Sequence, residues 1–505
     1  MNRWTPLAAA VLMSLPLGAT AAQDTTAARP LATLSLEEAI GQARANSPQY
    51  RQVLNNAGPA KWAVRNATTN LFLPSASAQM GFGYTGAGSS SFGGTQFNQS
   101  SPSYNSNYSV GVSWRLDGNT ITGPAQARAQ QHATEEDITA AGVQLRADVT
   151  IQYLSALQAV AQVDVARQQV RRNEDFLRLA QARYQVGQAT LLDVRRAEVD
   201  KGAADVALLR AEQSANEQKL ELLRRMGVES PVAIQQLALT DSFPVTAPTL
   251  QLDQLLTLSD AENPTLRSLR ALESAAGAAV TAARADFLPS LSVSAGWSGF
   301  AQEFTDENLI LGQTLAGAQG QYASCLENNQ IRASAGLLVN DCLLSAGLQD
   351  PSTLQPDVVT GFRDQNDVFP FSFRRSPFSA NVTVSLPIFT GFGRTLRVSQ
   401  ARAQREDADE AIRARRLAVR SEVHGRFLAL QTAHSSIAVQ AASRDAAREG
   451  LRLAQDRYRL GSGTALELSD AQNAVQRAEG DYINSVYGYH IALAALEGAV
   501  GRPLR

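Results

Sequence analysis

Four segments of the chain alternate strictly between apolar residues and small polar residues. A period of two is typical of a β-strand whose two faces meet different surroundings. The segments run to about 10 residues, which suits a tilted membrane-spanning strand, although a soluble β-sandwich shows the same alternation. The apolar positions are Ala76, Ala78, Met80, Phe82 and Tyr84; Tyr108, Val110, Val112, Trp114 and Leu116; Leu291, Val293, Ala295 and Trp297; and Phe378, Ala380, Val382, Val384, Leu386 and Ile388.

The small number of strands limits how they could cross a membrane. Spanning β-structure must close so that no edge meets lipid, and four strands cannot enclose an interior. Three chains would supply about twelve strands, an even number within the usual range. The pattern therefore predicts a barrel shared by three chains, with the apolar positions toward lipid and the Ser, Gly, Asn and Thr positions toward water.

Long helical stretches follow the two strand pairs, at about residues 124–186 and 395–460. Each has about 60 residues, which corresponds to roughly 90 Å of helix. Apolar residues recur at spacings of three and four, which predicts one buried stripe on a polar rod. A soluble fibrous coiled coil would show this stripe too, but strand hairpins would not interrupt it. The first stripe comprises Leu145, Val149, Tyr153, Leu157, Val160, Val163 and Val170.

Each long helix ends at a Tyr-x-x-Gly turn. Glycine suits the left-handed residue that terminates a helix. The chain is then predicted to reverse into a second helix, at Leu191–Met226 and again at Ala465–Val500, which makes two αα-hairpins with closed tips. The turn residues are Tyr184 with Gly187 in the first hairpin, and Tyr458 with Gly461 and Gly463 in the second.

The order of helix, strand pair, long helix, turn and helix occurs twice. The run LRLAQARYQVGQATLLDV begins at Leu177 and the similar run LRLAQDRYRLGSGTALEL at Leu451, which marks a duplicated unit. The tetrapeptide FLPS likewise occurs at 72–75 and at 287–290. The predicted organisation is a signal peptide at 1–22; a first repeat at 23–249, with a β-hairpin at 75–116 and a helical tip near 187; and a second repeat at 250–505, with a β-hairpin at 290–388, a long extracellular loop and a tip near 461.

The first 22 residues have the character of a secretory signal peptide. Arg3 supplies the charge, Leu7 to Leu17 the apolar core, and Ala19 to Ala22 the small residues before a cleavage site. The apolar core of about 11 residues is too short for a membrane helix. An ordinary hydrophobic N-terminus is the alternative.

Composition argues against several functions. Charged residues make up 18% of the chain and the formal net charge is −2, which provides no basic field for nucleic acid. Ser, His and Asp residues form no nucleophile–base pair, phosphate-binding loop or metal-ligand spacing. We therefore predict that the protein is not an enzyme and has no catalytic residue, cofactor or metal site.

Cys325 and Cys342 are the only cysteines, and both lie in the Gly-, Gln- and Asn-rich loop expected at about 301–375. In an exported protein this pair predicts one local disulfide. Closing a loop of about 18 residues would contribute roughly 3 kcal/mol to stability. A metal site is the alternative, but the four histidines are scattered without ligand spacing.

The sequence resembles the TolC-type outer-membrane efflux proteins. The resemblance is carried by RYxxG followed by T-x-L-[DE]-[VL] in each half, by the FLPS segments and by the order of strands and helices, and it extends from Leu34 to Pro503. It implies an α+β membrane protein: a trimer whose twelve-strand outer-membrane β-barrel, four strands per chain, continues into a periplasmic α-barrel of twelve long coiled-coil helices.

The same resemblance implies the function and the partners. The expected role is the exit duct of a tripartite efflux system for drugs or other small toxic molecules, with type I protein secretion as the alternative. The expected partners are two further copies of the chain, outer-membrane lipid, a periplasmic adaptor (membrane fusion) protein, and an inner-membrane pump or ATP-driven exporter. An exported coiled-coil scaffold or adhesin is the more remote hypothesis, since it would not need the four strands.

Site residues follow from matching family positions at the tips. Glu467 and Asp470 match the acids that narrow the pore; a solvated helical face is the alternative. Tyr458 and Asp193 match a pair that links the tips in the closed state, whereas a second family link is lost because its positions hold Gly463 and Leu192. The tip turns are the expected adaptor docking site, with Tyr184, Gly187, Gly461 and Gly463.

Overall fold

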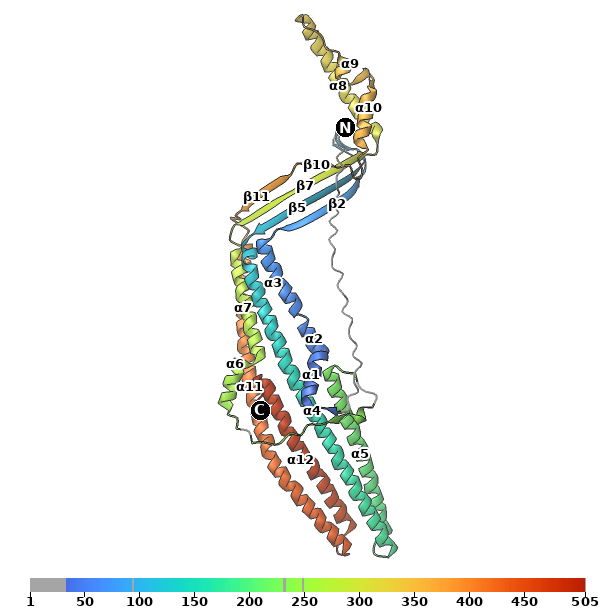
Figure 1. The fold of residues 1–505 in the computed structure, drawn as a ribbon, viewed down its shortest axis with the longest axis vertical. Helices are drawn as coiled ribbons and strands as arrows, with labels where there is room; N and C mark the ends of the chain where they lie inside the picture. The colour runs from blue at the N-terminus through green and yellow to red at the C-terminus, as the bar shows by residue number, and fades with distance from the viewer. Residues whose placement is uncertain (1–32, 93–94, 230–232, 248, 505) are drawn as a thin grey trace, which may run out of the picture. The chain divides into compact units, whose positions relative to one another are not determined.

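The computed structural model describes residues 33–92, 95–229, 233–247 and 249–504 (Figure 1). The expected signal peptide at 1–22 lies outside these residues. The chain divides into two compact units, each assembled from several segments. Unit 1 comprises Met1–Leu54, Ile138–Pro264 and Arg416–Arg505, and unit 2 comprises Asn55–Asp137 and Thr265–Arg415.

Unit 2 contains an antiparallel sheet built from the four predicted strands. They are β2 (Ser75–Thr85), β5 (Ser103–Leu116), β7 (Ser290–Phe304) and β11 (Ser379–Ser385), in the order β2–β5–β7–β11. A short strand, β10 (Arg374–Arg375), also pairs with β7. β11 is shorter than the predicted segment 378–388: its pairing with β7 ends at Ser385, whereas the apolar alternation in the sequence continues to Ile388.

The register places the apolar positions of all four strands on one face of the sheet. Ala76 pairs with Val112, Val112 with Ala295, and Ala295 with Ala380. Directly paired residues point to the same side of a sheet, so the alternation found in the sequence produces one apolar face and one face of small polar residues. Much of the apolar face is exposed, although the rings of Phe369 and Phe371 meet that of Phe82. Its exposed residues include Met80, Phe82, Val110, Val112, Trp297, Val382 and Val384.

Both outer strands of this sheet have an open edge. Within the described residues β2 pairs only with β5, and β11 pairs only with β7 and not with β2. Each therefore presents a row of backbone donors and acceptors that the sheet itself does not satisfy.

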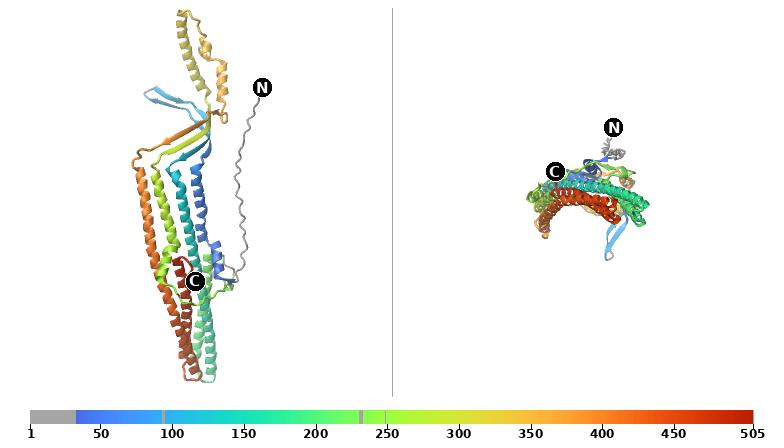
Figure 2. Two further views of the ribbon diagram at one scale, coloured as in Figure 1. Left: turned by 60° about the vertical axis from the view of Figure 1, so that its left-hand side comes forward. Right: turned by 90° about the horizontal axis from the view of Figure 1, so that it is seen from below.

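Each of the four main strands, β2, β5, β7 and β11, is joined to a helix at the same end of the sheet, so that a layer of helices continues from that end. Figure 2 shows α11, α7, α4 and α3 side by side in the same order as β11, β7, β5 and β2. Polar contacts fix the order near the junction: Asp286, the residue after α7, accepts from Asn119 of α4 at 2.7 Å and from Arg397 of α11 at 2.8 Å. The helices are α3 (Ala57–Phe72), α4 (Gly118–Gln185), α7 (Pro264–Ala285) and α11 (Gly393–Arg459).

The segments predicted as loops are folded. The first holds strands β3 (Gly88–Phe92) and β4 (Thr95–Ser100). The second holds a small subdomain of α8 (Glu307–Ser334), α9 (Cys342–Ser345), β8 (Leu348–Asp350), β9 (Thr353–Leu354) and α10 (Pro356–Asn366). Its core includes Leu311, Leu315, Ala318 and Tyr322 from α8. These residues recur at helical spacing, a signal that the Gly- and Gln-rich composition concealed.

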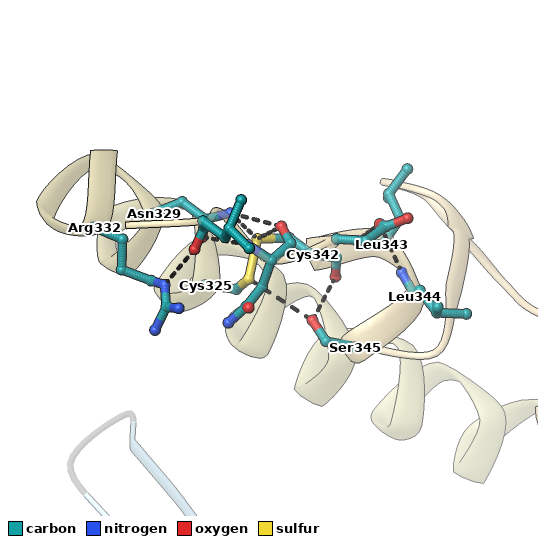
Figure 3. Close-up of a disulfide and its surroundings, with 10 residues drawn as sticks. Cys325, Asn329, Arg332, Cys342, Leu343, Leu344 and Ser345 are labelled. Carbon is teal, nitrogen blue, oxygen red and sulfur yellow. Dashed lines mark hydrogen bonds between the residues drawn. A yellow bond between two sulfur atoms is a disulfide. The ribbon is translucent and has the colours of Figure 1, made fainter. Parts of the chain in front are cut away.

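A disulfide closes this subdomain, as predicted (Figure 3). Cys325 of α8 is bonded to Cys342 at the start of α9, with the two Cα atoms 5.6 Å apart. Asn329 Nδ2 donates to the carbonyl oxygen of Asn340 at 2.8 Å, and Arg332 Nε donates to that of Leu338 at 2.8 Å. The bond and these contacts hold the connection between α8 and α9.

Unit 1 contains the helical hairpins. The returning helices of the hairpins are α5 (Leu191–Met226) and α12 (Ala465–Val500). The unit also contains α1 (Leu36–Asn46), α2 (Pro48–Leu54), α6 (Leu252–Glu262), the 3-10 helix η1 (Ile234–Gln236) and a parallel pair formed by β1 (Thr33–Leu34) and β6 (Ala238–Leu239). α5 and α12 have the predicted bounds. α4 and α11 end where the Tyr-x-x-Gly turns were expected and contribute residues to both units.

The C-terminal ends of α5 and α12 close in the same way. Gly227 and Gly501 both adopt left-handed backbone conformations, with φ of 72° and 96°. A Cβ at Gly227 would lie 2.5 Å from the carbonyl oxygen of Asn46, and a Cβ at Gly501 would lie 2.5 Å from Pro264. Glycine is needed at each position because of the left-handed backbone and because a side chain would clash with its neighbour.

Among the described residues, none of the helices is both long enough and apolar enough to cross a membrane.

Candidate functional site

The candidate site is the pair of helical tips in unit 1. α4 ends at Gln185 and α11 at Arg459, and Gly187 and Gly461 adopt left-handed conformations, with φ of 76° and 78°. The helix that returns from each turn begins with a threonine cap. Thr190 accepts a hydrogen bond from the backbone N–H of Asp193, and Thr464 accepts one from that of Glu467.

The caps give Asp193 and Glu467 equivalent places in the two hairpins. The carboxylate of Asp193 accepts two hydrogen bonds from Thr190, one from the backbone N–H at 2.9 Å and one from the hydroxyl at 2.8 Å. The carboxylate of Glu467 lies 3.6 Å from Arg457 Nη1 instead. An acidic group in the first turn is also favoured by the helix dipole.

An apolar cluster packs the two hairpins against each other behind the tips. Residues from α4, α5, α11 and α12 contribute to it. The cluster therefore fixes the two tips as neighbours. Its buried members are Phe176, Ala180, Val194, Ala197, Leu451, Tyr458, Ala465, Leu468 and Val475.

The two tip tyrosines, which match in sequence, have different surroundings. Tyr458 is 3% exposed and its ring meets the edge of Phe176 at 5.7 Å between centroids. Tyr184 is 46% exposed. The two turns therefore have the same backbone conformation but expose different side chains.

The hydroxyl of Tyr458 is buried and has no hydrogen-bond partner among the described residues. Burial raises the pKa of Tyr458; the charge of Arg183 opposes that shift and the charge of Asp193 adds to it. The carboxylate of Asp193 is near enough to act on Tyr458 electrostatically, but it bonds to its own cap. The direct link between Tyr458 and Asp193 therefore stays a prediction.

Arg183 connects the tips in a way that the sequence analysis missed. Its guanidinium donates from Nη1 to the backbone carbonyl of Tyr458, in the other hairpin. It also lies over the Tyr458 ring, with Cζ 4.6 Å from the centroid, and donates to the carbonyl of Gln188 at 3.3 Å. The matching residue of the second repeat, Arg457, contacts its own hairpin instead: it donates to the carbonyl of Ser462 at 3.3 Å and lies 3.6 Å from the carboxylate of Glu467.

The predicted pore acids both lie on the exposed side of α12. Glu467 and Asp470 are exposed and three residues apart, which places them on one helical face. Asp470 lines a groove of about 910 Å³ between α4, α5 and α12. The rest of the groove is formed largely by amides, alanines and the charged residues Arg477 and Asp481.

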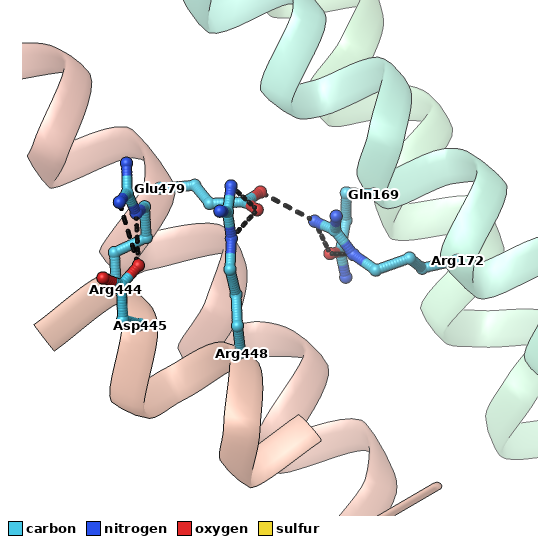
Figure 4. A network of polar contacts seen from close by, with 6 residues as sticks. All are labelled: Gln169, Arg172, Arg444, Asp445, Arg448 and Glu479. Atoms are coloured by element: carbon cyan, nitrogen blue, oxygen red, sulfur yellow. Dashed lines mark hydrogen bonds and ion pairs between the residues drawn. The ribbon is translucent and has the colours of Figure 1, made fainter. Parts of the chain in front are cut away.

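Farther from the tips, a buried ion cluster joins the two hairpins (Figure 4). Glu479 of α12, with a side chain 8% exposed, lies 3.1 Å from Arg448 of α11 and 3.4 Å from Arg172 of α4. Arg172 also donates twice to Gln169, at 2.8 and 3.1 Å. Burial lowers the pKa of Arg172, and the charge of Glu479 opposes that shift.

Further polar contacts accompany this cluster. Ser469 of α12 donates to the carboxylate of Asp200 in α5 at 2.6 Å, and Gln162 of α4 donates to the carbonyl of Gly480 at 3.0 Å. The interface between the hairpins therefore combines apolar packing at the tips with a polar layer above it. Such a layer specifies one alignment of the helices, because a shift would leave buried polar groups unsatisfied.

The described residues contain no group of three or more His, Cys, Asp or Glu side chains that could hold a metal ion.

Comparison with protein families gives one match. A family model described as outer membrane efflux protein matches residues 39–228 and 350–502. These ranges include both helical hairpins and both tips. The comparison with curated proteins found no match.

Solved structures share the fold across nearly the whole chain. A membrane protein from Pseudomonas aeruginosa is 21% identical with a TM-score of 0.64, over 93% of this chain and 90% of that one. The open state of the Neisseria gonorrhoeae MtrE outer membrane channel is 20% identical with a TM-score of 0.61, over 93% and 89%. The Vibrio cholerae outer membrane protein VceC is 16% identical with a TM-score of 0.63, over 93% and 97%. At these identities the likeness concerns the fold.

Proposed function

This chain belongs to the outer membrane efflux protein family, and we propose that three copies of it form the outer-membrane exit duct of a tripartite efflux system. In this proposal the trimer is a passive channel for drugs or other small toxic molecules. A periplasmic adaptor and an inner-membrane pump dock at its helical tips and supply the energy and the choice of cargo.

The observation that carries the proposal is the sheet of unit 2, which has one largely exposed apolar face and, within the described part of the chain, two open edges. Hydrocarbon favours the apolar face but cannot satisfy backbone groups, so the edges of β2 and β11 must pair with other strands. Pairing β2 of one copy with β11 of the next closes a ring. Three copies give about twelve strands, which is within the range of known barrels.

The polar face of the sheet would then line a water-filled passage. Ser, Gly, Asn and Thr residues occupy that face, including Ser113, Ser294 and Asn381 in one paired row. The helices that continue from the strands would extend the passage into the periplasm. The two repeats, 23–249 and 250–505, would each contribute one hairpin of strands and one of helices.

The tips would form the periplasmic mouth. Six carboxylates, from Glu467 and Asp470 of three chains, would surround the narrowest part and favour cations over anions. Arg183 and the Glu479 cluster would hold the two hairpins of each chain together in the closed state. The adaptor would dock at the turns that contain Tyr184, Gly187, Gly461 and Gly463.

Two neighbouring residues near the middle of β5 provide a matched test. Val110 lies on the apolar face, and Ser109 lies on the polar face. Val110→Arg should prevent stable assembly in lipid vesicles, because arginine on a lipid-facing position near the bilayer centre costs about 2–4 kcal/mol. Ser109→Arg should assemble normally and change only the ion selectivity of the channel.

The measurements are the mass of the detergent-extracted complex and the conductance in planar bilayers. The wild type and Ser109→Arg should have slightly less than three times the chain mass of 54.0 kDa, and both should conduct. A conducting monomer would refute the shared barrel. Normal assembly of Val110→Arg, with loss of assembly for Ser109→Arg, would reverse the assignment of the two faces.

A further inference from the structure

A single charged residue lies on the polar face of the four main strands. That face is otherwise formed by Ser, Gly, Asn, Gln and Thr residues, with Phe300 and Phe304 toward the C-terminal end of β7. The exception is Arg115, next to the last residue of β5, and its side chain is 69% exposed. These four strands therefore contribute one positive charge and no negative charge to the polar face.

Arg115 lies in the inner part of the sheet rather than at an open edge. It pairs with Ser292 of β7, which pairs in turn with Thr383 of β11. In the neighbouring row Ser113 of β5 pairs with Ser294 of β7. β5 lies between β2 and β7, and β7 lies between β5 and β11. Pairing of the outer strands with other copies of the chain would therefore leave the polar side of these rows open to the passage.

A depression of about 390 Å³ lies beside Arg115. The residues that line it include no Asp or Glu among the part of the chain that the structure describes. Hydroxyl and amide groups can donate hydrogen bonds to a negatively charged group, so the depression combines one cation with several neutral donors. These donors are Asn70, Ser75, Ser113, Ser292 and Ser294.

The fold makes little use of the guanidinium of Arg115. Within the described ranges its side chain forms no hydrogen bond, and its ion-pair partner is Asp117, with Arg115 Nε 3.8 Å from Asp117 Oδ2. Asp117 is already engaged, because its Oδ1 accepts from the backbone N–H and from the hydroxyl of Thr120, both at 2.8 Å. The two terminal nitrogens of Arg115 therefore remain available to a ligand.

We propose that this depression binds the carboxylate group of cargo molecules, with Arg115 as the charged ligand. The role in transport rests on the proposed function of the chain. A planar guanidinium binds a carboxylate through two parallel hydrogen bonds. The exposed hydroxyl of Ser294, which has no hydrogen bond of its own among the described residues, would donate a third.

In the proposed trimer three such sites would surround the passage where the barrel continues into the helices. Arginine side chains around a pore favour anions, whereas the tip acids Glu467 and Asp470 would favour cations. The two places would therefore act on opposite charges. The depression would supply an attraction for carboxylate-bearing cargo that the tips cannot provide.

Binding of 4-fluorobenzoate to the full-length trimer in detergent tests the site, with broadening of the fluorine NMR signal as the readout. We expect Arg115→Gln to bind the benzoate at least about tenfold more weakly than the wild type, because hydrogen bonds to a charged group are lost. Arg115→Lys retains the charge without the planar fork and should lie between the two. The amine 4-fluorobenzylamine has a similar shape and the opposite charge, and Arg115→Gln should not weaken its binding.

Two further variants are matched to Arg115→Gln. Arg374 is an exposed arginine that pairs with Phe300 and so lies on the same face, away from the depression; Arg374→Gln should leave binding unchanged. Ser294→Ala removes one hydroxyl without a change of charge and should weaken binding of the benzoate. The trimer mass and the circular dichroism should be the same for all variants, because neither Arg115 nor Ser294 bonds to the described fold through a side-chain hydrogen bond.

Planar-bilayer recordings at low salt provide the second readout, in which Arg115→Gln should lower the permeability to anions relative to cations. If the benzoate binds equally to the wild type and to Arg115→Gln, or if Arg374→Gln weakens binding as much, the site is wrong, and a conducting wild type leaves the proposed channel standing. If the benzoate binds through Arg115 but the wild type does not conduct, the site stands and the proposed function fails.

Discussion

Replacing Glu479 with alanine tests how strongly the buried ion cluster joins the two hairpins. The substitution removes the carboxylate that faces Arg448 at 3.1 Å and Arg172 at 3.4 Å. Arg172, whose side chain is only 18% exposed, would lose its charge partner while it remains enclosed. The guanidinium groups of Arg172 and Arg448 would also repel each other, because the carboxylate that separates them is gone.

The magnitude follows from the burial of each partner. Removing one member of a fully buried ion pair costs about 3–5 kcal/mol. Two features of this site reduce that cost: Arg448 is 53% exposed and can turn toward water, and Gln169 still accepts two hydrogen bonds from Arg172. We therefore expect the free energy of unfolding to fall by about 2–3 kcal/mol.

The assay is urea unfolding in detergent, followed by circular dichroism. Glu449→Ala is the matched control, because Glu449 forms an ion pair with Arg452 along α11 in which both side chains are more than half exposed. Such an exposed pair contributes little to stability, because water screens both charges. A double-mutant cycle with Arg172→Ala should give a coupling energy larger than the cycle with Arg448→Ala. Equal losses for Glu479→Ala and Glu449→Ala, or no coupling to Arg172, would refute the reasoning.

Three further predictions concern the tips and the disulfide. Replacing both Glu467 and Asp470 with alanine should abolish cation selectivity and weaken block by divalent cations added from the periplasmic side in bilayer recordings; unchanged selectivity would make them a solvated face. Tyr458→Phe should raise the free energy of unfolding by about 1 kcal/mol, because it removes a buried hydroxyl that has no hydrogen-bond partner among the residues described; a larger conductance and lower stability would instead show that the hydroxyl bonds to Asp193 in the trimer. Cys325 and Cys342 should react with a thiol reagent on intact cells only after reduction; reaction only after disruption of the outer membrane would place their subdomain on the periplasmic side.

Much of the fold could be predicted because its signals are local. Residues two apart in a strand lie on the same face, so the alternation placed Ala76, Val112, Ala295 and Ala380 each on the apolar side of its own strand. The register pairs these four residues and so joins the four apolar sides into one face. The helix ends were equally local, since Gly187 and its counterpart in the second repeat supply the left-handed residue that each turn needs.

The remainder depends on contacts between distant segments. No pattern around Arg183 indicates that its guanidinium meets the carbonyl of Tyr458, because that contact depends on how the two hairpins pack. The Glu479 cluster was missed for the same reason: its three charges come from three helices. The helices of the disulfide-closed subdomain were missed for a different reason, since glycines and amides diluted the apolar spacing of α8.

The different surroundings of the two tip tyrosines bear on the stoichiometry of assembly. In the proposed trimer, six tips would meet a partner, three with an exposed tyrosine and three with a buried one. A partner that recognises the exposed ring of Tyr184 would bind three times per trimer. One that recognises only the backbone turn, which both hairpins share, would bind six times. The ratio of adaptor to channel thus reports whether the two repeats of each chain bind the adaptor equally.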